Sequence, residues 1–414
     1  MLIADFHIHS KYSRACSENL TLENIDLYAN KKGLDILGTG DMTHPKWFNE
    51  IKNKLKEKEG EKGIYELKEN PHVRFVLSTE LALVFEKDKK IRKIHIVVLA
   101  PSIEVLEKIN NELSRYSNLA IDGRPTLNIS GAEIIDLFKS ISNDIFVFPA
   151  HAWTPWFGVF GSKSGFDSLK EAFDERYKEI YAIETGLSSD PPMNWRISSL
   201  DDIALISNSD AHSLENLGRE ANMFDLEKIS YINIISSIKN KTFYGTLEYY
   251  PEEGKYHFDG HRNCNVELAP KDAIKMNNIC PICKKPLTLG VLHRIEDLAD
   301  RDVGYIPKNA KPFKHIIPLL ELISYVLNKN KYSKVVRDSY NYLITQYKNE
   351  INLLLNADLD SIKSFNEDLA KALYNIRNDK VNVIPGYDGV FGRIDPLNRL
   401  DKKETFYDKQ RKLF

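Results

Sequence analysis

The chain has 414 residues, with 57 Lys and Arg against 59 Asp and Glu, for a net charge of −2. This length suggests two or three domains. The balanced charge means that any nucleic-acid surface must be a local patch. No run approaches the ~18 apolar residues of a membrane span, and the N-terminal residues do not form a signal-peptide pattern. We therefore expect a cytoplasmic protein without membrane segments.

Strand-like and helix-like segments alternate over roughly the first 250 residues. Helical spacing marks 21–33 and 131–142. Apolar or β-rich runs mark strands at 2–7, 34–40, 72–86, 92–101, 144–151, 181–185 and 203–212. This alternation predicts a parallel α/β sheet or barrel. Polar side chains follow several of these strands, as expected at the C-terminal mouth of a barrel.

Histidines and carboxylates recur at those strand ends. His7 and His9 form an H-x-H pair on one face of a strand, because strand side chains alternate with period two. Further candidates are Asp41, His44, His151, Asp210 and His212, which follow strands, and Glu80 and His95, which lie inside apolar runs. Each motif alone is weak, since a buried histidine is commonly just hydrogen-bonded in a core. Together they predict a cluster of divalent ions, because mixed imidazole and carboxylate ligands suit Zn, Mn and Fe.

The cysteines indicate a second metal site. "GHRNC" and "CPIC" place His261, Cys264, Cys280 and Cys283 in two pairs with two-residue spacing. Such paired spacing predicts one structural zinc in a reducing compartment. His257 and His293 are competing nitrogen donors, so the fourth ligand stays open at this point.

Two segments are candidate DNA contacts. "HAWTPWFGVFGS" brings Trp153, Trp156 and Phe157 directly after His151, and aromatic rings can stack on bases. The alternative is that these rings pack the mouth of the barrel. The segment from 292 to 315 contains Arg294, Arg301 and Lys308, and also Lys311 and Lys314. These could bind phosphates, although such runs are commonly just solvated faces.

The motifs "DFHIHSKYS", "GTGDMTHP", "STE", "PAH" and "NSDAH" resemble, in order, those of the PHP superfamily of phosphoesterases. The resemblance implies a distorted (β/α)7 barrel over 1–250, with two to three divalent ions of Zn, Mn, Mg or Fe. The implied ligands are His7, His9, Asp41, Glu80, His95, His151, Asp210 and His212. Glu80 would bridge two ions, and catalysis would centre on Asp210, His212 and His151. Many members have His after the Asp of the second motif; here Met42 stands there, and His44 is a candidate replacement.

The order of the parts adds a more specific resemblance. A barrel, a zinc module at 251–313 containing "LHRIEDLADR", and a helical region at 314–414 that includes "VIPGYDGVFGRI" resemble the endonuclease Q family. This implies hydrolysis of DNA 5′ of deaminated bases (uracil, hypoxanthine, xanthine) and abasic sites, leaving 3′-hydroxyl and 5′-phosphate ends. Two alternatives stay open: a phosphatase of the histidinol-phosphate kind, and a non-catalytic DNA-binding accessory protein. We expect a monomer. A sliding clamp is a candidate partner, although no clear clamp-binding peptide is present.

Overall fold

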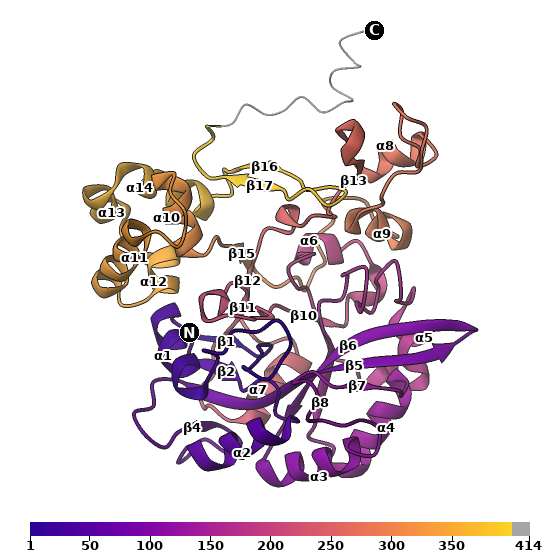
Figure 1. Ribbon diagram of the computed structural model, residues 1–414, viewed down its shortest axis with the longest axis vertical. Coiled ribbons are helices and arrows are strands. Elements are labelled where there is room, and N and C mark those ends of the chain that lie inside the picture. Colours follow the sequence, from indigo (N-terminus) through magenta and orange to yellow (C-terminus); the bar gives the residue numbers. More distant parts are fainter. Residues whose placement is uncertain (400–414) are drawn as a thin grey trace.

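The computed structural model describes residues 1–399 (Figure 1). Seven strands of these residues form a barrel: β1 (Leu2–Asp5), β2 (Ile36–Gly38), β5 (Arg74–Lys87), β6 (Lys90–Ala100), β8 (Phe146–Pro149), β9 (Ala182–Glu184) and β10 (Ala204–Ile206). β1, β2 and β5 are parallel, and so are β9 and β10. β6 runs antiparallel to both β5 and β8. The predicted distorted α/β barrel is confirmed, and β6 is its distortion.

Two backbone contacts close the barrel outside the regular ladders. The N–H of Ala152, just after β8, donates to the carbonyl of Glu184 at the end of β9 (3.0 Å). Ile8 and Ala211 form a parallel bridge beyond the ends of β1 and β10. Because these contacts join the C-terminal ends of the strands, the residues that follow β1, β8, β9 and β10 converge on one mouth.

Helices and short strands cover the barrel. The helices are α1 (Leu22–Lys32), α2 (Pro45–Lys54), α3 (Ile103–Leu113), α4 (Gly131–Ile141), α5 (Leu169–Phe173), α6 (Pro191–Asn194) and α7 (Tyr231–Lys239). The additional strands are β3 (Leu55–Glu57), β4 (Tyr65–Leu67), β7 (Thr126–Leu127), β11 (Ala221–Phe224) and β12 (Gly245–Glu248). The predicted first helix forms as expected: the Thr21 side chain caps its start, and Gly33 with φ of 92° ends it.

The predicted zinc module contains β13 (Asp259–His261), β14 (Val266–Leu268), α8 (Pro270–Lys275) and α9 (Val291–Leu298). α9 joins this module to the barrel. The guanidinium of Arg294 donates to the carbonyls of Phe160 (3.0 Å) and Phe166 (3.1 Å) in the loop after β8. Arg301 makes a forked ion pair with Asp201 (2.7 and 2.5 Å). Arg294 and Arg301, two of the predicted DNA contacts, therefore bind other parts of the protein.

The C-terminal region is helical over much of its described length. β15 (Phe313–His315) first adds a parallel strand to β12. Then follow α10 (Leu319–Leu327), α11 (Lys334–Tyr347), α12 (Glu350–Asn356), α13 (Leu359–Phe365) and α14 (Glu367–Arg377). The hairpin of β16 (Asn382–Ile384) and β17 (Arg393–Asp395) crosses from these helices to the zinc module (Figure 1), where Phe258 N–H donates to the Gly386 carbonyl (2.9 Å). The region expected to be helical thus includes a β-hairpin. The domain boundaries near 250 and 313 remain predictions.

No helix in residues 1–399 combines the length and apolar character that crossing a membrane requires.

A buried ion pair joins the helical region to the barrel. Lys32 at the end of α1 lies 2.9 Å from Glu350 at the start of α12, and both side chains are only 4% exposed. Glu350 also accepts from the backbone N–H of Leu319 (2.9 Å) and the hydroxyl of Tyr340 (2.7 Å). The carboxylate is therefore fully engaged, and its charge compensates a lysine that has little access to water.

We expect Glu350→Gln to lower the free energy of unfolding by about 3 kcal/mol, because it leaves the Lys32 charge buried without a partner. Urea denaturation would measure this. The matched control is Glu107→Gln, which removes an exposed pair with Lys52 and should cost less than about 1 kcal/mol. Equal effects of the two substitutions would contradict the prediction.

Candidate metal centre

Two groups of ligand atoms meet at Glu80. One contains His7, His9, Glu80 and Asp210, and the other contains Glu80, His95 and His151; within each group the ligand atoms lie within 4.8 Å of one another. Oε1 of Glu80 lies 2.6 Å from His95 Nδ1 and 3.0 Å from His151 Nε2. Oε2 lies 3.4 Å from His9 Nε2. One carboxylate thus faces both groups, as a ligand shared by two ions would.

The backbone positions these side chains in two ways. Glu80 and His95 lie within the long β5–β6 hairpin rather than after a strand: Glu80 pairs with Val97 and His95 with Ala82, so the two are diagonal neighbours on one face. Asp41, His151 and Asp210 follow strands and have φ of 45°, 28° and 45°. Non-glycine residues seldom adopt this left-handed region, and such strain concentrates at functional sites.

Burial and charge act against each other in this cluster. Burial opposes ionisation of Glu80, but the neighbouring His95 and His7 outweigh it and hold the pKa of Glu80 well below its usual range. Asp210 behaves in the same way: burial raises its pKa, and His7 and His9 lower it by more. Burial lowers the pKa of His95 to about 4, which keeps its imidazole neutral and its lone pair available at neutral pH.

Glu184 supports the ligands from behind. Its Oε2 lies 3.0 Å from His7 Nδ1 and accepts from the His151 backbone N–H (2.7 Å), and its Oε1 accepts from the Asn208 amide (2.9 Å). Because a carboxylate only accepts, His7 carries its proton on Nδ1 when neutral, and Nε2 points into the cluster. That buried Nε2 has no hydrogen-bond partner. A neutral nitrogen fixed in this way is what a metal ligand requires, so the residues fit a divalent ion.

Three predicted residues lie outside the two groups. Asp41 lies behind His9, with Oδ1 at 3.0 Å from His9 Nδ1 and Oδ2 accepting from Ser10 N–H (2.7 Å). The His212 ring lies 4.5 Å from the His9 ring and is partly exposed. His44 stacks on Tyr12 and contacts the Ala120 carbonyl (3.3 Å). Neither group found among residues 1–399 contains these three side chains, so their roles as metal ligands remain predictions.

The second predicted site also comes together. His261, Cys264, Cys280 and Cys283 place their ligand atoms within 4.8 Å of one another. His293, one of the competing donors, instead binds Asp259 through Nδ1 (2.6 Å), and the quartet does not include His257. Three sulfurs and one imidazole suit a closed, tetrahedral zinc site with no position left open for substrate.

The comparisons with known proteins identify the family. Residues 318–380 match the family described as the MJ0043 C-terminal domain. The lesion-specific endonuclease PfuEndoQ of Pyrococcus furiosus is similar in structure, with a TM-score of 0.85, 32% identity, and coverage of 97% of this chain and 98% of that one. The chain belongs to the endonuclease Q family. Endonuclease Q in complex with a 27-mer duplex carrying an abasic lesion is also similar, with a TM-score of 0.83, 31% identity, and coverage of 97% and 99%.

Two relatives known from sequence are uncharacterised. The protein MJ0043 of Methanocaldococcus jannaschii is 34% identical over 251 residues, which are 59% of this chain and 31% of that protein. The chain therefore spans about a third of that relative's length. YqxK of Bacillus subtilis is 28% identical over 338 residues, 77% of this chain and 82% of YqxK.

The predicted DNA contacts of this endonuclease Q family member differ in their exposure to solvent. Trp153 is 1% exposed and donates to Asn194 (2.7 Å), so the expected contact between Trp153 and DNA is wrong: the ring packs the core. Trp156 is 55% exposed, with the Lys93 ammonium 5.4 Å from its ring. Phe157 is half-buried, and its ring lies 4.2 Å from that of His95. Lys308 is exposed.

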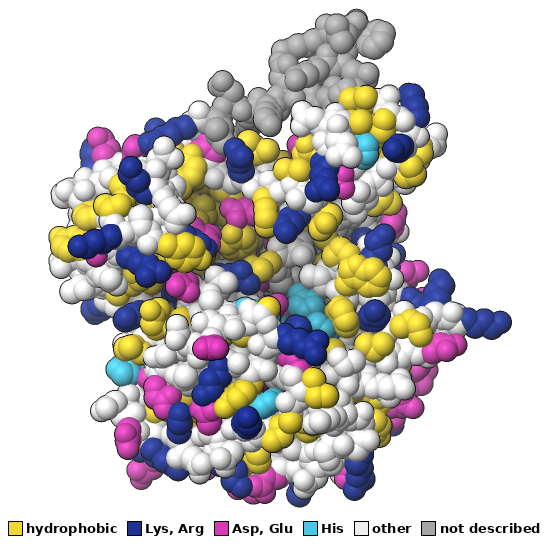
Figure 2. Space-filling view, viewed as in Figure 1, with side chains coloured by type: hydrophobic (Ala, Val, Ile, Leu, Met, Phe, Trp, Pro, Cys, Tyr) yellow, Lys and Arg dark blue, Asp and Glu magenta, His cyan; other side chains and the backbone are white. Residues whose placement is uncertain are grey.

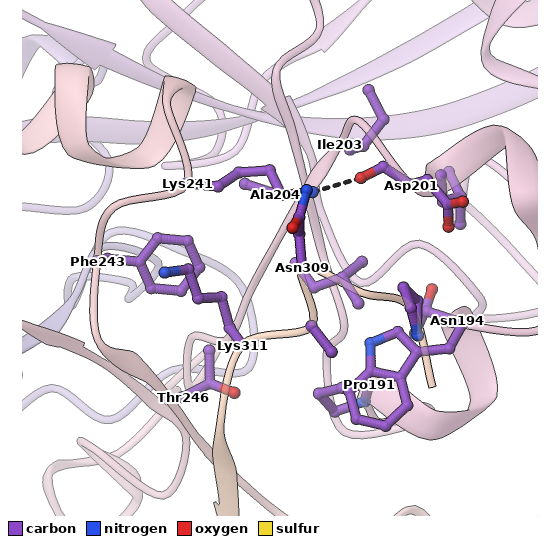
Figure 3. Close-up of a pocket in the computed structure, with 15 residues that line it drawn as sticks. Pro191, Asn194, Asp201, Ile203, Ala204, Lys241, Phe243, Thr246, Asn309 and Lys311 are labelled. Atoms are coloured by element: carbon purple, nitrogen blue, oxygen red, sulfur yellow. Dashed lines mark hydrogen bonds between the residues drawn. The ribbon is translucent and has the colours of Figure 1, made fainter. Parts of the chain in front are cut away.

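A separate pocket lies beside β10 and β12 (Figure 3). It is lined by Ala204 at the start of β10, whereas Asp210 follows the end of that strand. Lys241 and Lys311 also line it, and Lys241 bonds to the Asp201 carbonyl. The pocket holds none of the predicted ligands. In Figure 2, histidine side chains instead lie near the centre of the face, below a hollow between the helical region and the zinc module.

We expect Glu184→Gln to weaken Mn²⁺ binding about 10- to 100-fold, because the amide no longer fixes the proton on His7 Nδ1. Isothermal titration calorimetry would measure this affinity. Glu179→Gln, which removes only a surface pair with Lys139, is the control and should bind Mn²⁺ as the wild type does. Unchanged affinity in Glu184→Gln would refute the supporting role.

We expect Cys280→Ser to lose one zinc per chain and to expose residues 251–300 to proteolysis, because folding of a small module with such a site depends on its metal. Elemental analysis and limited proteolysis would test this. Cys16→Ser, outside the quartet, should keep its zinc. A Cys280→Ser protein with full zinc content would exclude the assignment.

Proposed function

We propose that this protein is a metal-dependent endonuclease that hydrolyses the phosphodiester of damaged DNA. The observation that carries the proposal is the pair of ligand groups sharing Glu80 in a chain that matches endonuclease Q over 97% of its length. The ligand set favours an enzyme over a non-catalytic DNA-binding accessory protein, because a protein without catalytic activity would not need to keep buried His and carboxylate groups aligned.

Metal ions bound at such a centre supply hydroxide at neutral pH and neutralise the charge of the attacked phosphate. His7, His9, Glu80, His95, His151 and Asp210 would hold them. Glu184 and Asp41 orient His7 and His9 through their Nδ1 atoms. His212 is partly exposed next to His9, which makes it the imidazole of this set best placed to exchange a proton with substrate. Asp210, His151 and His212 are the residues on which we propose that catalysis depends.

The finer specificity is also a proposal. We assign cleavage 5′ of deaminated bases and abasic sites, with 3′-hydroxyl and 5′-phosphate products. An abasic duplex in the complex of a 31% identical endonuclease Q supports the choice of damaged DNA. The phosphatase alternative needs neither the zinc module nor the C-terminal helices, which both belong to the region matched by endonuclease Q. We further propose a monomer in the cytoplasm; a sliding clamp stays a candidate partner.

The decisive experiment uses labelled duplexes with one uracil, hypoxanthine or abasic site, an undamaged control, and Mg²⁺ or Mn²⁺. We expect a single cut 5′ of the lesion, and a rate at least about 10³-fold lower in Asp210→Asn, because Asp210 is a proposed metal ligand. Circular dichroism should be unchanged. No cut on any duplex, together with hydrolysis of a small phosphomonoester, would favour the phosphatase.

Trp156 is the aromatic residue that we propose to contact DNA, since its ring is exposed in the loop after His151. Trp156→Ala should slow nicking about tenfold or more with little change in stability, because a stacked base contributes roughly 1–3 kcal/mol. Trp153→Ala should do the opposite and mainly lower the melting temperature, because that ring is core. Comparable loss of stability in both variants would remove Trp156 from the interface.

A further inference from the structure

Arg124 contacts the carboxylate that the two ligand groups share. Its Nη1 lies 3.1 Å from Oε2 of Glu80, the oxygen that faces His7 and His9. Among residues 1–399 it is the one Lys or Arg side chain whose ion pair with a proposed catalytic-metal ligand is seen. Glu80 is fully buried, whereas the Arg124 side chain is 27% exposed. The guanidinium therefore reaches from the mouth of the barrel to the shared carboxylate.

The loop that carries Arg124 is fixed at several points. The N–H of Gly123 donates to the Tyr12 carbonyl (3.0 Å), and a Cβ on Gly123 would lie 2.3 Å from Asp41 Oδ2. The Pro125 carbonyl accepts from Ala82 N–H (3.0 Å), next to the pairing of β7 with β5. This close packing leaves no room for a side chain at 123 unless Asp41 and Ser13 shift, and it holds the following residue next to the ligands.

A cation in this position has two conceivable roles. It could simply be a partner for the Glu80 carboxylate, but the ring nitrogens of His95 and His151 already lie 2.6 and 3.0 Å from its Oε1. A structural partner of a buried carboxylate would also be expected to be buried itself, and Arg124 is not. A guanidinium offers a planar fork of donors that matches phosphate oxygens. An arginine that is fixed, partly exposed and adjacent to the cleavage site suits an anion better than it suits a core ion pair.

We propose that Arg124 binds the phosphate that is cleaved, donating to its non-bridging oxygens while Glu80 serves as a metal ligand. This inference deepens the proposed function and rests on it. Arg124 is then a substrate-binding catalytic residue: the negative charge on the phosphate oxygens increases toward the transition state, and a fixed cation stabilises it there.

The test compares Arg124→Ala and Arg124→Lys with the wild type, all loaded with Mn²⁺. The control is Arg115→Ala, which removes an exposed arginine paired only with Glu112 on α3. Calorimetry with inorganic phosphate measures anion binding, elemental analysis measures metal content, and single-turnover nicking of an abasic duplex measures the reaction. We expect phosphate binding to weaken about tenfold in Arg124→Ala, because the anion loses a charge-assisted hydrogen bond, and less in Arg124→Lys. Nicking should slow about 100-fold with unchanged metal content.

Unchanged phosphate affinity in Arg124→Ala would overturn the proposal. Loss of bound metal in that variant, with normal phosphate binding once metal is restored, would also overturn it in favour of a structural role. The proposed function fails separately: if wild type binds phosphate through Arg124 but cuts no damaged duplex, Arg124 is a phosphate ligand for another ester, and only the DNA specificity is lost.

Discussion

The rest of the centre depends on the placement of one carboxylate, Glu80, between two sets of imidazoles. A fully buried carboxylate would be very costly without compensation, so its presence in the β5–β6 hairpin requires polar partners on both sides. His95 and His151 face one oxygen, and His7 and His9 face the other. His95 and His7, when protonated, lower the pKa of Glu80 by more than burial raises it.

A second layer makes this arrangement specific. Glu184 and Asp41 bind the Nδ1 atoms of His7 and His9, so the Nε2 atoms of both rings point to the same space. The strained backbone at Asp41, His151 and Asp210 lies at strand ends where the barrel closes. Such conformations persist only where surrounding hydrogen bonds determine them, as the backbone bond from His151 to Glu184 does here. The barrel thus supplies both the ligands and the groups that orient them.

The additional parts of the chain are tied to the barrel by specific polar contacts. Lys32 and Glu350 join it to the C-terminal helices, and Arg294 joins α9 to the loop that follows His151. That loop carries Trp156, so the zinc module fixes the base of a segment at the edge of the mouth. The hairpin β16–β17 then connects the helices to the zinc module (Figure 1). A barrel for small phosphoesters would not need these connections, which suit a long substrate lying across several parts.

The sequence by itself determined the metal chemistry and the class of fold. Alternating apolar runs set the strands, short-range spacing set the H-x-H and paired Cys motifs, and these depend only on local periodicity. The tertiary structure decided which groups meet. Glu184 and Arg124 are distant in sequence from His7 and Glu80, and only closure of the barrel and the packing of Gly123 bring them within bonding distance. It also decided that Trp153 packs inside while Trp156 stays exposed, because two residues three positions apart in an irregular loop have no periodicity that could reveal their orientation.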